Sequence, residues 1–235
     1  MKNKRLGSRL LSVSSMVRRG AVLADIGTDH AYLPIYLLKQ GIISRAVCSD
    51  INEGPLASAR ENLIEEGLLG SAELVLTSGA AALSDRGITD YAVCGMGGEL
   101  IADIIGAAPA MRGRGVRLIL QPMTKHECLR AYLAAEGFRV LEEKYSCDEG
   151  KYYTALSAEF LAEPRAITEY EAYFGAGTEG DITDSARLGY INARASALKK
   201  IILGKRGAGV DFSAEQALLD ELYEKTKIIP LKELL

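Results

Sequence analysis

The chain has 235 residues, of which 48% are hydrophobic and 25% charged, and its formal net charge is −3. These values exclude a disordered chain and a disulfide-stabilised miniprotein, and the longest apolar runs are far shorter than the ~18 residues that a membrane span needs. The overall charge does not favour a nucleic-acid partner. However, residues 1–20 and 187–206 each hold 6 basic and no acidic side chains, which predicts either two local sites for a polyanion or two solvated helix faces.

The first predicted element is a basic amphipathic helix that Gly20 ends. The apolar residues of its buried face recur at steps of four, three and four, namely Leu6, Leu10, Val13 and Val17. An Arg- and Ser-rich beginning can resemble a targeting peptide. Serines interrupt the apolar residues here, and the helix leads directly into a strand, so we expect no cleaved leader.

Strands and helices then alternate along the chain. Strands are predicted over residues 21–26, 46–50, 72–77, 91–94 and 117–121, and helices over 31–40, 55–67, 99–107 and 125–137. This alternation predicts an α/β fold, a doubly wound and mostly parallel sheet with right-handed crossovers. Residues 138–144 and 152–159 then resemble an antiparallel hairpin. Methyltransferases that use S-adenosylmethionine close their Rossmann-like sheet with an antiparallel terminal strand, whereas dinucleotide-binding domains add a further parallel unit.

A change of pattern after Pro164 predicts a domain boundary, with an α/β domain over 1–164, whose terminal hairpin is typical of methyltransferases, and a small C-terminal helical domain over 165–235. Residues 183–185 open a long helix, and residues 204–209 break it. Ser213 and Gln216 have the spacing of a capping box for a second helix. The two apolar seams are Leu188, Ile191, Ala195, Leu198 and Ile202, then Leu219, Leu222, Thr226 and Ile229. We expect an antiparallel coiled-coil hairpin, or two helices packed on the main sheet.

The cysteines and histidines do not have the spacing of a metal site. The four cysteines, Cys48, Cys94, Cys128 and Cys147, are far apart, and the chain has only 2 histidines. We therefore expect reduced thiols, no metal and a cytoplasmic protein.

The ends of the predicted strands carry the chemistry, because ligands of open parallel sheets bind beyond the carboxyl ends of the strands. The first strand ends in Asp25, and Gly27 allows a tight turn. Asp29 stands where a phosphate-binding loop would have a third glycine. A carboxylate there repels phosphate and suits a cationic ligand, such as the methionine end of S-adenosylmethionine. Asp50 ends the second strand, where a carboxylate can accept both ribose hydroxyls of an adenosine.

Four runs closely resemble the bacterial tRNA (adenine-22-N1)-methyltransferases, the TrmK family. They are ADIGTDHAYLPIYL at 24–37, SDINEGPLASAR at 49–60, CGMGGELI at 94–101 and LILQPM at 118–123. The resemblance covers roughly residues 5–160; beyond it only the architecture is similar, since that family carries a C-terminal helical coiled-coil extension. The resemblance implies a class I methyltransferase that moves a methyl group from S-adenosyl-L-methionine to N1 of adenine 22 in the D arm of tRNA.

The resemblance also implies roles for individual residues. Cofactor-binding residues would be Asp25, Gly27, Thr28, Asp29, His30, Asp50, Ile51, Ser78, Gly79, Gly95 and Met96. The resemblance implies that Gly97 and Gly98 bind the substrate, and the two basic stretches predict further substrate contacts at Arg5, Arg9, Arg18, Arg19, Lys199 and Lys200. Ser78 is a departure, because the family usually has an acidic residue there, near the adenine amino group, and a hydroxyl accepts a hydrogen bond more weakly than a carboxylate.

Adenine N1 has an in-plane lone pair, so methylation needs no strong general base. Catalysis would rest on in-line positioning, with Asp29 compensating the charge on the methylated ring and His30 orienting it. His30 could instead have only a structural role, bonding to the backbone at the start of the helix. The buried base would flip out into a pocket beside residues 95–98, and Tyr32, Tyr152 and Tyr153 could stack on bases or belong to the core.

Three other functions stay open at this stage. They are a methyltransferase of the same fold acting on a small molecule or protein, a non-catalytic RNA-binding module, and a nicotinamide-dependent dehydrogenase, which Asp29 disfavours. The expected partner is tRNA, held at its phosphates by the basic N-terminal helix and the C-terminal hairpin. We expect no membrane partner, and a monomer or weak dimer.

Overall fold

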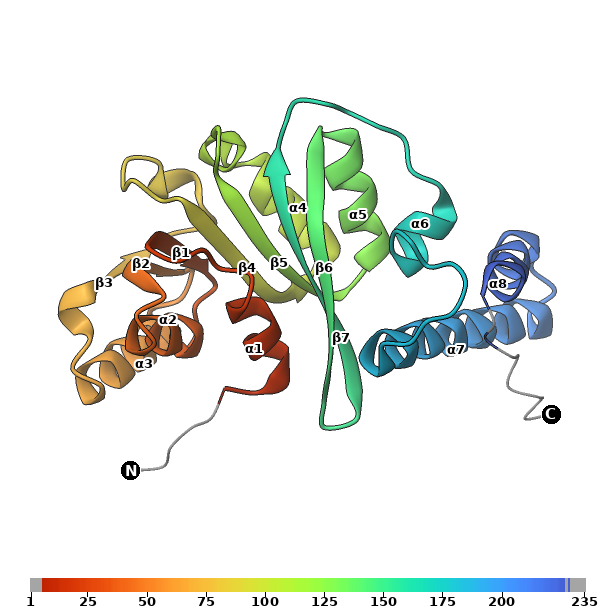
Figure 1. Cartoon of the computed structure of the whole chain (residues 1–235), viewed down its shortest axis with the longest axis horizontal. Helices are drawn as coiled ribbons and strands as arrows, with labels where there is room; N and C mark the ends of the chain where they lie inside the picture. Colours follow the sequence, from red (N-terminus) through yellow and green to blue (C-terminus); the bar gives the residue numbers. More distant parts are fainter. Residues whose placement is uncertain (1–5, 227, 229–235) are drawn as a thin grey trace.

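The computed structural model describes residues 6–226 and 228, and its centre is a seven-stranded sheet in the order β3-β2-β1-β4-β5-β7-β6 (Figure 1). The strands are β1 (Ala21–Ile26), β2 (Ile43–Asp50), β3 (Ala72–Leu76), β4 (Asp90–Gly97), β5 (Arg117–Thr124), β6 (Phe138–Asp148) and β7 (Lys151–Phe160). Pairing is parallel from β3 to β5, while β7 is antiparallel to both β5 and β6. The predicted parallel sheet with an antiparallel terminal strand is confirmed.

Helices cover both faces of the sheet. They are α1 (Ser8–Ser14), α2 (Tyr32–Lys39), α3 (Glu53–Glu65), α4 (Gly98–Gly106), α5 (His126–Ala135), α6 (Glu169–Phe174), α7 (Ser185–Gly207) and α8 (Ser213–Lys225). Along β4, Tyr91 and Val93 join the apolar cluster of α4 and α5, while Ala92 between them joins the cluster of α1 to α3. Successive strand side chains thus fill opposite layers, as expected for a sheet buried on both faces.

Two strands that lead to the candidate site are longer than the sequence indicates. We expected β4 to end at Cys94 and β5 at Gln121, but their pairing continues to Gly97 and Thr124. Two register irregularities follow Cys94 in this stretch. Glycines tolerate such bulges, so a Gly-rich run that suggests a loop can continue a strand.

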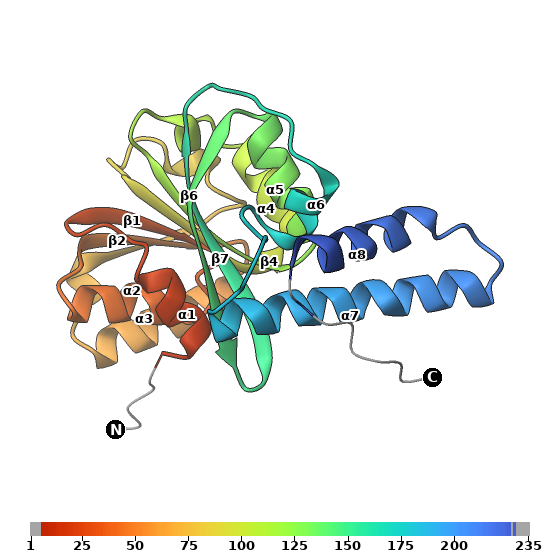
Figure 2. The ribbon, with the colours of Figure 1, turned by 45° about the vertical axis from the view of Figure 1, so that its right-hand side comes forward.

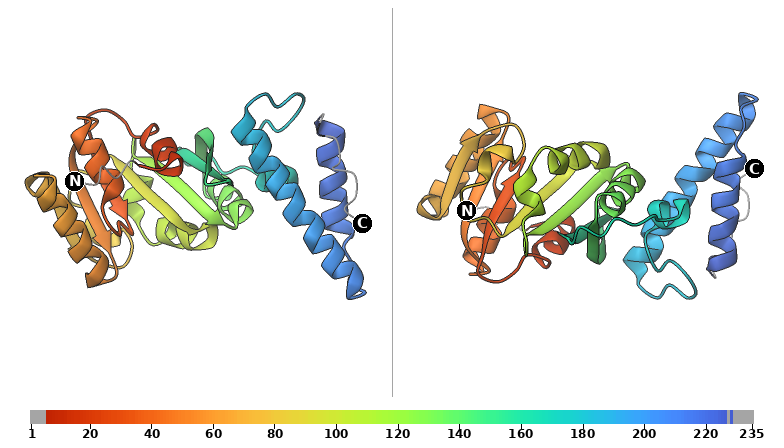
Figure 3. Two further views of the ribbon diagram at one scale, coloured as in Figure 1. Left: turned by 90° about the horizontal axis from the view of Figure 1, so that it is seen from below. Right: turned by 90° about the horizontal axis from the view of Figure 1, so that it is seen from above.

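The C-terminal helices α6, α7 and α8 form an arm beyond the β6 edge of the sheet (Figure 3). Helices α7 and α8 lie side by side as an antiparallel hairpin (Figure 2), and α7 also packs on β6 and β7. Both arrangements that the sequence left open are therefore present. The arm has its own apolar cluster, which includes Ile191, Leu198 and Leu222. The domain boundary at residue 164 stays a prediction.

Helix α7 ends at Gly207, within the break that was predicted at residues 204–209. One detail of the predicted hairpin is wrong. Ser213 is not the N-cap of α8. It is the first helical residue, and its amide and hydroxyl both bond to Asp211 at 3.0 Å. Ile229 of the second seam lies outside the described residues.

A capping box does occur at another helix, α6, where sequence analysis placed none. The Thr168 hydroxyl accepts a bond from the Glu171 amide, and the Glu171 carboxylate accepts one from the Thr168 amide, each at 3.1 Å. Thr178 and Gly175 then turn the chain towards α7.

Within residues 6–226, none of the helices is both long and apolar enough to cross a membrane.

Candidate active site

The carboxyl ends of β1, β2, β3 and β4 surround a cavity of about 550 Å³. All eleven residues predicted to bind the cofactor line it, namely Asp25, Gly27, Thr28, Asp29, His30, Asp50, Ile51, Ser78, Gly79, Gly95 and Met96. They come from four separate strand ends, which a parallel sheet brings together at one edge. Arg9 of α1 also lines the cavity, so the first helix is part of this site.

Asp25 is the buried carboxylate of the cavity. Its side chain accepts a 2.6 Å hydrogen bond from the Thr28 hydroxyl. Burial raises the pKa of Asp25 to about 6, the negative charge of Asp50 adds to the rise, and the Thr28 bond opposes it. A cation placed in the cavity would lower the pKa of Asp25 again, because it favours the ionised carboxylate.

The turn after β1 has an unusual backbone that exposes two polar side chains. Gly27 has φ of 70°, and a Cβ there would overlap the Met96 side chain. Asp29 adopts the left-handed region with φ of 51°, which is uncommon for a residue with a side chain and marks a turn held by its surroundings. The Asp29 carboxylate is 70% exposed and lies 3.6 Å from the His30 ring, itself 41% exposed, so both can meet a ligand.

His30 also has structural contacts. Its ring stacks on Tyr32, with centroids 5.1 Å apart, and its carbonyl accepts a 2.9 Å bond from the Asn62 amide. The carbonyl bond holds the start of α2 against α3, so the backbone of His30 supports the turn while its ring faces the cavity.

Asp50 and Ile51 follow β2 on the neighbouring side of the cavity. The Asp50 carboxylate accepts a 3.0 Å bond from the Asn52 amide, and Ile51 is 65% exposed. Ser78 is exposed in the segment after β3. A carboxylate next to an exposed apolar side chain offers both polar and apolar contacts to one ligand.

Gln121 of β5 is a site residue that sequence analysis missed. Its side-chain oxygen accepts bonds from Arg9 Nη1 at 2.6 Å and from the Gly95 amide at 3.2 Å. Its amide group donates to the Pro122 carbonyl at 2.8 Å. Gln121 is fully buried, so these bonds fix the Arg9 guanidinium beside the Gly95 turn. Two signals pointed to Gln121: it is a polar residue in an apolar strand, and it lies in the run LILQPM that resembles the family.

Gly97 and Gly98, predicted to bind substrate, do not line the cavity. A Cβ on Gly97 would lie 3.3 Å from Thr124 Oγ1, and one on Gly98 would overlap the Lys125 carbonyl. Their missing side chains therefore allow the start of α4 to pack against the β5–α5 connection.

The other basic residues predicted to contact the substrate differ in how far the protein already uses their side chains. Arg18 is committed to structure, because its guanidinium bonds to the fully buried Asp90 at 2.6 Å and to the Thr89 carbonyl. Arg19 and Lys200 are exposed, while the Lys199 ammonium lies 5.6 Å from the Tyr223 ring. Arg5 lies outside the described residues.

Two of the predicted stacking tyrosines are occupied by protein contacts. Tyr153 lies 5.9 Å from the Arg9 guanidinium, and Tyr152 packs against Gly189 of α7. Tyr32 lines the cavity.

The cysteines are free thiols, and no group of three or more metal-binding side chains occurs among residues 6–226 and 228. Burial raises the pKa of the Cys48 and Cys94 thiols well above their usual range, so both are neutral at pH 7.

Comparisons with known proteins agree with this geometry. Residues 6–156 match the family model described as a methyltransferase domain. The chain is 34% identical over 159 residues to the tRNA (adenine(22)-N(1))-methyltransferase of Bacillus subtilis, covering 68% of this chain and 67% of that one.

Two solved structures are similar over nearly the whole chain. The B. subtilis m1A22 tRNA methyltransferase TrmK has a TM-score of 0.76 at 28% identity, covering 94% of this chain and 95% of that one. The Streptococcus pneumoniae protein Sp1610, solved in complex with S-adenosyl-L-methionine, has a TM-score of 0.80 at 28% identity, covering 93% and 99%.

Proposed function

The chain belongs to the methyltransferase domain family and, within it, to the tRNA (adenine(22)-N(1))-methyltransferases, and we propose that it methylates N1 of adenine 22 in the D arm of tRNA. The methyl donor in this proposal is S-adenosyl-L-methionine. The observation that carries it is the cavity, where Asp25, Asp29 and Asp50 from two adjacent strand ends meet beside the Gly27 turn.

The cavity residues fit this cofactor in charge and in shape. S-adenosyl-L-methionine supplies an electrophilic methyl group on a sulfonium cation. Asp50 would accept the ribose hydroxyls, and Ile51 would cover the adenine. Asp25 and the Gly27 turn would hold the methionine end, where a cation offsets the cost of the buried carboxylate. Ser78 would accept a hydrogen bond from the adenine amino group.

The protein's part in the reaction is positioning and charge compensation. Adenine N1 carries a free lone pair at neutral pH, so no residue has to remove a proton before attack. Asp29, exposed in the cavity, would offset the positive charge that develops on the methylated ring. His30, 3.6 Å from Asp29, would orient that carboxylate and the base.

The RNA would bind through basic side chains that the protein leaves available. Arg9 would contact a phosphate or the target nucleotide at the cavity, because Gln121 fixes its guanidinium there. Arg19, Lys199 and Lys200 would contact phosphates further away. The target base would have to flip out of its helix to reach Asp29.

Calorimetric titration with S-adenosyl-L-methionine and S-adenosylhomocysteine tests the cofactor proposal. We expect the unaltered protein to bind both, and Asp50→Ala to abolish measurable binding because two ribose hydrogen bonds to a carboxylate are lost. Asp85→Ala, at an exposed position outside the cavity, is the matched control and should bind as the unaltered protein does. Binding of tRNA without binding of either nucleoside would contradict the proposal and favour an RNA-binding module.

A further inference from the structure

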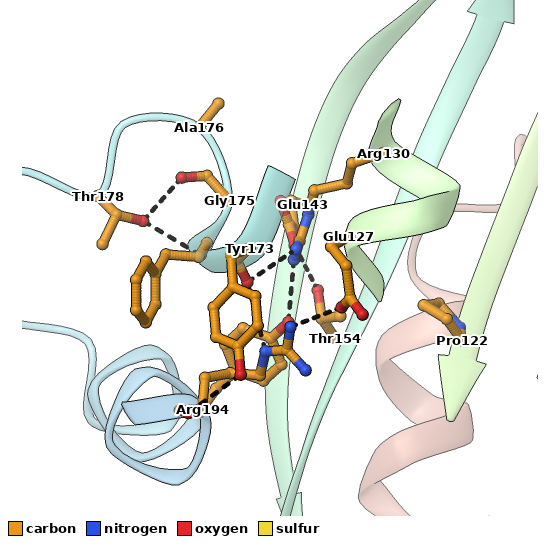
Figure 4. Close-up of polar contacts among 12 residues, drawn as sticks. Pro122, Glu127, Arg130, Glu143, Thr154, Tyr173, Gly175, Ala176, Thr178 and Arg194 are labelled. Atoms are coloured by element: carbon orange, nitrogen blue, oxygen red, sulfur yellow. Dashed lines mark hydrogen bonds and ion pairs between the residues drawn. The ribbon is translucent and has the colours of Figure 1, made fainter. Parts of the chain in front are cut away.

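The C-terminal helices are attached to the sheet through a buried charge. Arg130 of α5 is only 5% exposed, and its guanidinium donates to the carbonyls of Ala172 at 2.8 Å and Tyr173 at 3.3 Å. It also pairs with Glu143 of β6 and bonds to the Tyr190 hydroxyl of α7 at 3.1 Å. Figure 4 shows Arg130 and Glu143 meeting between α5, the hairpin strands and the end of α6. One side chain therefore joins four elements.

A second set of contacts surrounds this arginine. Arg194 of α7 bonds to Glu127 of α5 at 2.6 Å, and its guanidinium lies 3.7 Å from the Tyr173 ring (Figure 4). The His126 ring meets the Tyr190 ring edge to face, with centroids 5.6 Å apart. Burial, together with the charges of Arg194 and Arg130, lowers the pKa of His126 to about 4, so this ring is neutral at pH 7.

A close approach of backbone and ring completes the attachment. Gly189 of α7 lies directly against Tyr152 of β7, and a Cβ at that position would overlap the Tyr152 ring. The helix can approach the hairpin this closely only because residue 189 has no side chain. We call the contacts of Arg130, Arg194, His126 and Gly189 with their partners the joint.

The segment that carries the joint also supports the cavity. Residues 121–130 begin with Gln121, which holds Arg9 and the Gly95 amide. The Lys125 carbonyl packs against Gly98 at the start of α4. Three helical residues of the same segment, His126, Glu127 and Arg130, belong to the joint. The cavity and the C-terminal helices are thus fixed to opposite ends of one ten-residue segment.

We infer that Arg130 is a positioning residue, which holds the C-terminal helices at a fixed place relative to the cavity so that tRNA bound on them presents its adenine there. The inference rests on the proposed function. Its basis is the geometry of the guanidinium, whose planar fork reaches two carbonyls, a carboxylate and a hydroxyl at once. A buried ion pair such as Arg130–Glu143 adds little net stability, because removing both charges from water is costly. In this inference its role is to specify one arrangement of the C-terminal helices.

Steady-state kinetics of Arg130→Lys with full-length tRNA tests the inference. Lysine keeps the charge beside Glu143 but lacks the fork that reaches α6 and α7. We expect KM for tRNA to rise about tenfold or more, because displaced C-terminal helices and the cavity can no longer contact one tRNA at the same time. We also expect kcat at saturating tRNA and the affinity for S-adenosylhomocysteine to stay within about twofold. Arg139→Lys is the matched control, because Arg139 forms an exposed ion pair with Glu163 at 2.9 Å.

A second variant displaces the helices without altering any charge. Gly189→Ala should push α7 away from β7 and raise KM for tRNA in the same way, and adding Tyr152→Ala should restore it by removing the overlapping ring. If kcat and cofactor affinity fell by the same factor as KM rose, the variant would have a general folding defect, and the inference would be overturned. Unchanged KM in both single variants would overturn it as well.

Small-angle X-ray scattering of the free proteins separates this inference from the proposed function. We expect Arg130→Lys, and not Arg139→Lys, to broaden the distribution of interatomic distances, whether or not tRNA is methylated. If the unaltered protein does not methylate tRNA, the proposed function fails. Identical scattering from Arg130→Lys and the unaltered protein would then overturn the positioning role too.

Discussion

The cavity and the joint both contain carboxylates, but they use them in opposite ways. In the joint, Glu143 and Glu127 are each paired with an arginine, Arg130 and Arg194. In the cavity, neither Asp25 nor Asp50 has a lysine or arginine within 4.0 Å among the described residues. The joint therefore satisfies its own charges, whereas the cavity keeps negative charge for which a bound cation would be the partner.

This difference separates structural ion pairs from a binding site. Charges with partners fix the arrangement of elements, and removing one partner leaves the other buried and unpaired. Burial of the Asp25 carboxylate without a cationic partner costs free energy in the empty protein, and a bound cation would offset that cost.

The largest effect is expected from breaking the central pair of the joint. Arg130→Met should lower the free energy of unfolding by about 3–5 kcal/mol, because Glu143 is left as an uncompensated buried charge. Arg139→Met, at the exposed pair, should cost less than about 1 kcal/mol. Chemical denaturation followed by circular dichroism measures both free energies of unfolding. Equal losses in the two variants would show that the buried Arg130–Glu143 pair matters no more than an exposed pair.

Removing a charge from the cavity should affect the reaction rather than the fold. Asp29→Asn keeps the shape of the side chain and should lower kcat for tRNA methylation about tenfold, a modest loss because solvent screens this exposed carboxylate. Thermal melting should not change. Glu61→Gln on the exposed part of α3 is the control. An unaltered kcat in Asp29→Asn would remove Asp29 from the mechanism.

The unpaired state of Asp25 should make cofactor affinity depend on pH. Its pKa is raised to about 6, so the carboxyl is mostly protonated at pH 5 and mostly ionised at pH 7. A cationic ligand favours the ionised form, and affinity for S-adenosyl-L-methionine should therefore rise about tenfold from pH 5 to pH 7. Calorimetry at the two pH values measures the rise. In Asp25→Asn the rise should disappear, and its persistence would assign the pH dependence to another group.

The smallest effect concerns the helix caps of the C-terminal arm. Thr168→Ala removes the observed capping box of α6 and should cost about 1 kcal/mol. Ser213→Ala at the start of α8 should cost less, because Asp211 still accepts the bond from the amide of residue 213. Denaturant titration of the two variants compares them. A larger loss in Ser213→Ala would restore the capping role that its spacing suggested.

Sequence reasoning located the cavity because its residues obey a local rule. Asp25 and Asp50 each end a buried strand, and parallel strands bring their carboxyl ends to one edge. The family resemblance supplied the full set of eleven cofactor residues, and all of them line the cavity because they follow these strand ends. Gln121 was missed because its role depends on Arg9, 112 residues away in the chain.

The joint and the basic contacts could not be found in this way. Arg18 has the pattern of a phosphate contact, yet it pairs with Asp90, 72 residues further along the chain. Arg130 contacts α6 and α7 only because the fold returns them to α5. The comparisons show the same contrast, since the family model ends at residue 156 while similarity to solved structures extends over 93% or more of the chain. The C-terminal arm is therefore similar in structure to these proteins, although it lies outside the part of the chain that the family model matches.

The most direct measurement is base-resolved detection of methylation on a tRNA transcript incubated with the protein and S-adenosyl-L-methionine. Methylation of N1 blocks base pairing, so reverse transcription should stop one nucleotide before adenine 22. The stop should be absent with Asp50→Ala and with a transcript carrying guanine at position 22. A modification at another position, or none in the presence of bound cofactor, would contradict the account.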